Sequence, residues 1–124
     1  MNDIKEDKRR KLFDEINKER HRQDDRWGEQ NYRVLAEYSI SATLEDMRST
    51  HGIMSQGFYR TRAESKRTSW LDILMEEVAE FAESAFIDGY ASDEARKELI
   101  QVIAVGVSML ECMDRRREEN NGSQ

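Results

Sequence analysis

The sequence contains no proline, one cysteine and no uninterrupted apolar run long enough to cross a bilayer. A lone Cys112 cannot form an internal disulfide, which is typical of a reducing compartment. The most apolar stretch, residues 99–113, is broken by Gln101, Ser108 and Glu111 and falls short of the ~20 residues of a membrane span. The charged N-terminal residues show no signal peptide. We therefore expect a cytoplasmic protein without a membrane partner.

The balance of charge argues against broad nucleic-acid binding. The formal net charge is −6, and binding to phosphate backbones relies on surplus lysine and arginine. Basic residues cluster at residues 8–11 and 115–117, but both clusters lie near the termini and alternate with acids. Solvated helix ends are the simpler interpretation of these clusters.

Helix-forming residues dominate the composition, with abundant Glu, Lys, Arg, Ala, Leu and Met. A chain of 124 residues is typical of one domain, here residues 1–124. We expect an all-α helical bundle whose modest core is completed by oligomerisation.

Apolar spacing, capping residues and glycines predict four helices, over residues 4–25, 34–48, 70–88 and 93–116. Gly28 and Gly89 are expected to end the first and third helices. Ser69 with Asp72 forms a capping-box pattern, and Ser92 is a suitable N-cap. The remaining segments are expected to be a loop or insertion (residues 50–68) and a disordered tail (residues 118–124).

Four glutamates crowd one helix: Glu76, Glu77, Glu80 and Glu83. An amphipathic helix with a solvated acidic face is the simpler interpretation. Ile73 and Ile87 lie on the same side, however, and a purely solvated face does not need them. They favour contact between this face and protein.

The helix over residues 99–113 is apolar on every side, and such a helix is buried all round. A chain this small can hardly surround it alone, so we expect a homodimer or a dimer of dimers. Glu98 and Gln101 open this helix, and polar groups there need partners.

The helices over residues 70–88 and 93–116 are expected to form an antiparallel hairpin. Along the helix axes, Glu77 and Glu80 then lie within about one helical turn of Glu98 and Gln101. Within each pair the residues are three apart and share a face. Converging carboxylates repel one another unless a cation neutralises them. Oxygen-only ligands favour Mg²⁺, with Mn²⁺ possible, and Mg²⁺ sites usually engage substrate phosphates.

These residues resemble the signature of the MazG-like all-α nucleoside triphosphate pyrophosphohydrolases, in a bacterial or phage form. The family pattern is EExxE, a gap, and ExxD, and here residues 76–80 read EEVAE and residues 98–101 read ELIQ. HRQDDRWGEQN (residues 21–31), Trp70 ahead of the glutamates, and ELIQVIAV (residues 98–105) extend the similarity. The match covers residues 19–31 and 70–117.

The resemblance implies hydrolysis of NTPs or dNTPs to a monophosphate and pyrophosphate, as nucleotide-pool house-cleaning. It implies Mg²⁺ ligands at Glu77, Glu80, Glu98 and Gln101, and a catalytic set of Glu76, Glu77, Glu80 and Glu98, with one glutamate accepting the proton of the attacking water. Gln23, Trp27 and Gln30 would line the nucleotide pocket, with Trp27 stacking on the base. A core anchor is the alternative role for Trp27.

Gln101 stands where the family pattern usually has aspartate. Its amide oxygen can bind Mg²⁺ but brings no negative charge, so weaker cation affinity is expected. Two alternatives follow: a catalytically impaired member that binds a nucleotide or a protein partner, and a purely structural helical oligomer.

Overall fold

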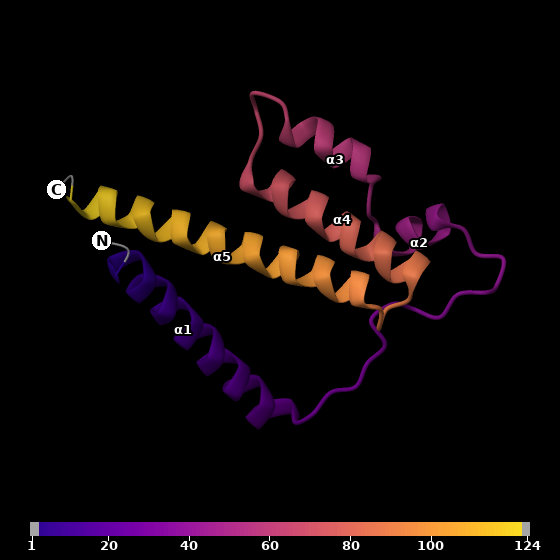
Figure 1. Ribbon diagram of the computed structural model, residues 1–124, viewed down its shortest axis with the longest axis horizontal. Coiled ribbons are helices and arrows are strands. Elements are labelled where there is room, and N and C mark those ends of the chain that lie inside the picture. The colour runs from indigo at the N-terminus through magenta and orange to yellow at the C-terminus, as the bar shows by residue number, and fades with distance from the viewer. Residues whose placement is uncertain (1–2, 123–124) are drawn as a thin grey trace. The chain divides into compact units, whose positions relative to one another are not determined.

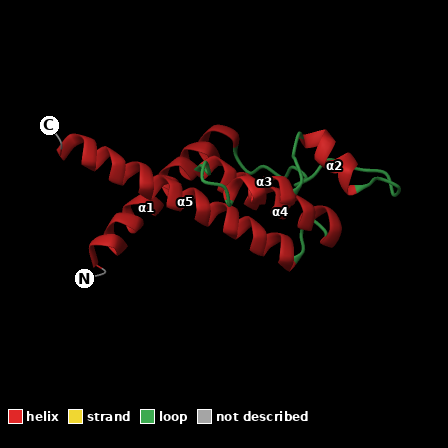
Figure 2. Ribbon diagram, turned by 90° about the horizontal axis from the view of Figure 1, so that it is seen from above, coloured by secondary structure: helices red, strands yellow, loops and turns green. Residues whose placement is uncertain are grey.

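A computed structural model describes residues 3–122, and all regular structure in that range is α-helical, as expected. The helices are α1 (Asp3–Trp27), α2 (Leu44–His51), α3 (Gln56–Ala63), α4 (Trp70–Asp88) and α5 (Asp93–Gly122), joined by loops (Figure 2). The described chain divides into two compact units, a terminal unit (residues 3–32 and 110–122) and a central unit (residues 33–109). Within residues 3–122, no helix combines the length and the apolar character needed to span a membrane.

Helix α4 begins and ends at the predicted caps, and α5 begins at its predicted cap. Ser69 and Asp72 form the capping box of α4: the Asp72 amide donates to Ser69 Oγ at 3.2 Å, and the Ser69 amide donates to Asp72 Oδ2 at 3.1 Å. Gly89 ends α4 with φ of 101°, a backbone conformation that favours glycine. Ser92 Oγ then accepts from the Ala95 amide at 3.1 Å and starts α5.

The helix predicted over residues 34–48 is wrong for residues 34–43, which are turns and irregular chain. Thr43 and Asp46 form a second capping box, with bonds of 2.8 and 3.2 Å, so helix α2 begins only at Leu44. The Tyr38 ring packs edge-on against Phe86 of α4, with the ring centroids 5.6 Å apart. This tertiary contact anchors residues 34–43 on α4.

The segment expected to be a loop or insertion, residues 50–68, contains helix α3. Ser55 caps α3 by accepting from the Phe58 amide at 3.3 Å. Tyr59 is buried, and its hydroxyl accepts from the Met54 amide at 3.1 Å. Helix α3 lies along α4 (Figure 1), so this segment covers the helix that bears the acidic residues.

The buried apolar residues of the central unit are mostly small: Met47, Tyr59, Ala79, Ala82, Ala85, Ala95 and Val107. Alanines on α4 allow neighbouring elements to approach its backbone closely. On α5, by contrast, Leu99, Ile100 and Ile103 are exposed in the single chain. The predicted burial of this apolar helix on all sides is therefore not achieved by one chain.

The terminal unit combines α1 with the last turns of α5. Leu12 is the buried residue of α1, and ion pairs join Arg9 to Glu111 at 3.1 Å and Lys8 to Glu118 at 3.2 Å. Gly28, with φ of 67°, follows α1 as predicted. Helix α5 continues through residues 118–122, which were expected to be a disordered tail, and residues 123–124 lie outside the described part of the chain.

Candidate metal centre

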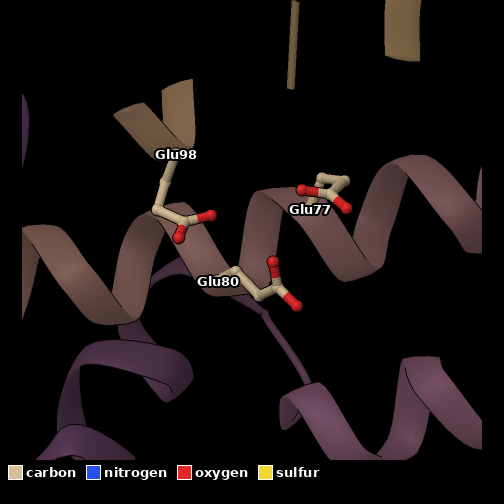
Figure 3. Close-up of side chains that lie close together, drawn as sticks. All are labelled: Glu77, Glu80 and Glu98. Atoms are coloured by element: carbon tan, nitrogen blue, oxygen red, sulfur yellow. The ribbon is translucent and has the colours of Figure 1, made fainter. Parts of the chain in front are cut away.

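Three glutamates from α4 and α5 bring their carboxyl groups together. Glu77, Glu80 and Glu98 each offer one oxygen, and these oxygens all lie within 4.8 Å of one another. Figure 3 shows the side chains of Glu77, Glu80 and Glu98 close together. All three residues are partly buried. We call this set the glutamate cluster.

The spacing of the glutamate cluster suits a divalent cation. Two oxygens bound to one Mg²⁺ at ~2.1 Å lie no more than ~4.2 Å apart, and oxygens around Ca²⁺ at ~2.4 Å reach ~4.8 Å. The three oxygens of the glutamate cluster all lie within 4.8 Å of one another, which is compatible with a single divalent ion between them.

Electrostatics in the cluster disfavour three bare charges. Burial raises the pKa of the Glu77 carboxyl, and the nearby Glu98 and Glu76 carboxylates raise it further. Burial is also the main cause of the raised pKa of Glu80, with Glu77, Glu98 and Glu76 adding repulsion and Arg60 opposing it. A cation removes both the repulsion and the cost of burying charge.

Gln101 extends the cluster by one turn of α5. When its amide nitrogen faces the acids, it donates to Glu98 Oε2 and to Glu77 Oε2 at 3.2 Å each. Turned over, the same amide presents a carbonyl oxygen, which is a suitable ligand for a hard cation. The N–H groups thus stabilise the ion-free cluster, and the oxygen suits the cation-bound one.

The other two glutamates of α4 contact residues of α2 and α3. Glu76 Oε1 accepts from Arg60 Nε at 3.1 Å. Glu83 Oε2 accepts from Gln56 Nε2 at 2.9 Å and from Arg48 at 3.4 Å. Glu76 was predicted in the catalytic set; it lies next to the cluster in sequence, but its carboxylate is paired to Arg60.

The residues predicted to line a nucleotide pocket belong to the terminal unit. Gln23 accepts a hydrogen bond from Arg20 at 2.7 Å and donates to Glu19 at 3.1 Å. Trp27 is half exposed, with the guanidinium groups of Arg22 and Arg26 at 5.9 and 5.2 Å from its ring centre. Gln30 is exposed. Trp27 is therefore not a core anchor of the described chain.

The contribution of α3 to this region was not predicted. Arg60 contacts Glu76 and lies 3.6 Å from Glu80 Oε1, so a basic residue stands beside the cluster. The only signal in the sequence was the basic composition of residues 59–67. A run of basic residues in the sequence does not show which acidic residue each of them will contact.

No protein-family model, curated protein or solved structure matches the chain, so its fold and site rest on its own residues.

Proposed function

We propose that the protein is a Mg²⁺-dependent pyrophosphohydrolase that converts NTPs or dNTPs to the monophosphate and pyrophosphate. The observation that carries this proposal is the convergence of Glu77, Glu80 and Glu98 from two helices, with oxygens within 4.8 Å. A hard cation held by few protein ligands keeps free positions and typically engages phosphate oxygens. The sequence resemblance to MazG-like enzymes supports the same chemistry.

In this proposal Glu77, Glu80, Glu98 and Gln101 hold Mg²⁺ or Mn²⁺. The bound cation would offset phosphate charge and lower the pKa of a coordinated water. A cluster glutamate accepts the proton from the attacking water.

The nucleoside is proposed to contact Gln23, Trp27 and Gln30. An exposed indole offers a flat surface for base stacking, and the two amides offer donors and acceptors for base edges. We further propose that the working form is a homodimer or a dimer of dimers. Exposed apolar residues on α5, among them Ile100 and Ile103, support association.

The test is pyrophosphate release from a panel of NTPs and dNTPs, with and without Mg²⁺. We expect Mg²⁺-dependent turnover that Glu77→Gln or Glu98→Gln lowers at least ~100-fold, as for the loss of a group acting in the transition state. Glu94→Gln is the matched control, because Glu94 lies one turn before Glu98 on α5 and is exposed. Absence of turnover with every nucleotide contradicts the proposal.

Gln101 favours a second candidate, a member of the same fold that binds nucleotide without hydrolysing it. Its amide can hold Glu77 and Glu98 together without a cation. Thermal stabilisation by nucleotide and Mg²⁺ without release of pyrophosphate would support this binding role. A purely structural helical oligomer would show neither response.

A further inference from the structure

Arg60 stands at the rim of the glutamate cluster and contacts two acids of α4. Its Nε donates to Glu76 Oε1 at 3.1 Å, and one of its terminal nitrogens lies 3.6 Å from Glu80 Oε1. The side chains of Glu76 and Glu80 are 18% and 22% exposed, whereas that of Arg60 is 53% exposed. Arg60 therefore neutralises acids at its inner edge and keeps most of its five N–H donors in solvent.

Two other arginines of the central unit, Arg62 and Arg48, form ion pairs that serve the fold. Arg62, two residues along α3, donates to Asp72 at 2.7 Å, and Asp72 is the capping residue of α4. Arg48 is largely buried, and its side chain joins Glu45 and Glu83. Arg60 alone of the three has a cluster member, Glu80, as a partner.

The negative charge of a bound triphosphate would need a positively charged side chain beside this site. A divalent ion leaves the three carboxylates with a net charge of about −1, and a triphosphate adds a further −3 to −4. Among the ion pairs of the described residues, the one that reaches the glutamate cluster comes from Arg60. Its planar guanidinium matches phosphate geometry and can donate two parallel hydrogen bonds.

We propose that Arg60 is a substrate-binding residue that moves from Glu76 and Glu80 to the phosphates of the nucleotide, an inference that rests on the proposed function. Glu80, when it holds a divalent ion, would pair more weakly with Arg60, because both bind the same carboxylate. The weakened ion pair then frees the exposed guanidinium, which turns to the phosphate oxygens at the rim. Helix α3 thereby supplies a positive charge beside α4, which contains no lysine or arginine.

The proposal makes opposite predictions for two ligands. Removing Arg60 removes a positive charge beside Glu80, so the affinity for Mn²⁺ alone should stay equal or rise by up to a few-fold. The affinity for pyrophosphate in saturating Mn²⁺ should fall about tenfold, as expected for the loss of one charge-assisted hydrogen bond. A side chain that only supports the fold would weaken both when removed.

The experiment titrates Mn²⁺, and then pyrophosphate in saturating Mn²⁺, into the full chain by calorimetry. The variants are Arg60→Ala, Arg60→Lys and, as matched control, Arg62→Ala, which removes an arginine of similar exposure and a carboxylate pair from the same helix. We expect Arg60→Ala to lose pyrophosphate affinity only, Arg60→Lys to recover part of it, and Arg62→Ala to keep it. For NTP turnover, Arg60→Ala should raise KM more than it lowers kcat.

Equal pyrophosphate affinity in wild type and Arg60→Ala overturns the assignment, as does a parallel loss of Mn²⁺ affinity or an equal loss in Arg62→Ala. These results leave the proposed function intact as long as the wild type binds Mn²⁺ and releases pyrophosphate. A wild type that binds no divalent cation overturns both proposals together. If Arg60→Ala does not fold, Arg60→Lys carries the test, because it keeps the charge and removes the planar fork.

Discussion

At the scale of single residues, Gln101 decides how the glutamate cluster behaves without a cation. A neutral amide that donates to Glu77 and Glu98 at 3.2 Å replaces repulsion by two hydrogen bonds. An aspartate here would add a charged ligand but would leave the ion-free cluster with four carboxylates. In the proposed metal site, glutamine would thus lower the cation affinity and stabilise the ion-free cluster.

Gln101→Asp should therefore bind Mn²⁺ about tenfold more tightly, because one more charge faces the ion at short range. Without a divalent ion, the same variant should unfold at a lower temperature than wild type. Calorimetric titration and thermal melts with and without Mn²⁺ measure the two effects. Gln101→Ala is the control, since it loses both the amide donor and the oxygen ligand and should not gain affinity. Unchanged affinity in Gln101→Asp would show that Gln101 does not face the ion.

The raised pKa values of Glu77 and Glu80 set the sign of a pH effect on stability. A carboxyl whose pKa is higher in the folded than in the unfolded state disfavours folding when ionised. The penalty applies above the folded pKa and disappears as pH falls toward the ordinary value of 4.5. In the absence of divalent ions, the cluster's contribution to stability should therefore improve as pH falls from 7 to about 5.

Glu77→Gln should remove part of this penalty and raise the free energy of unfolding at pH 7 by roughly 0.5–1 kcal/mol, a few like-charge pairs at ~0.2–0.5 kcal/mol each. Urea titrations in EDTA at pH 5 and pH 7 measure it, and the gain should shrink at the lower pH. Added Mg²⁺ should reverse the order, because wild type then gains the binding free energy. Lower stability of Glu77→Gln at pH 7 without divalent ions would contradict the raised pKa.

At the scale of elements, local signals in the sequence located α4 and α5, because Ser69 with Asp72, Gly89 and Ser92 act on their immediate neighbours. The same kind of signal, Thr43 with Asp46, also marks the start of α2, but apolar spacing over residues 34–48 obscured it. Helix α3 is short and poor in apolar periodicity. Its position is fixed by tertiary contacts such as the burial of Tyr59.

The glutamate cluster was predictable for a related reason. Residues three apart on each helix share a face, so Glu77 with Glu80 and Glu98 with Gln101 could be paired from spacing and a hairpin alone. The spacing could not separate Glu77 from its neighbour Glu76, because that difference depends on Arg60 from α3. Contacts between helices that no pattern in the sequence pairs can be found only in the folded structure.

The capping box of α4 provides a test at this scale. Ser69→Ala should lower the free energy of unfolding by about 1 kcal/mol, because the Asp72 amide loses its acceptor at the start of the helix. Ser65→Ala is a control, since Ser65 is exposed and its hydroxyl bonds to the Arg62 carbonyl and the Arg67 amide, outside any N-cap. Chemical denaturation measures both, and equal stability of the two variants would contradict the role of the cap.

At the scale of the whole molecule, helix α5 has small residues that are buried and large apolar residues that are exposed. In the central unit Ala95 and Val107 are buried, while Ile100 and Ile103 are 50% and 53% exposed. Large apolar residues exposed at neighbouring positions of one helix are typical of an interface. Self-association also fits the limited core of a chain of 124 residues.

The proposed homodimer can be tested by placing a charge on this exposed surface. Light scattering should give wild type a molecular mass of about twice that of the 14.6 kDa chain, or about four times that mass for a dimer of dimers. The double variant Ile100→Glu and Ile103→Glu should shift the mass toward one chain, because an interface cannot bury unpaired carboxylates. Met54→Glu is the matched control, since Met54 is also 50% exposed but lies in the loop before α3. A wild type of single-chain mass at tens of micromolar, or a double variant of unchanged mass, would show that this face of α5 is not the interface.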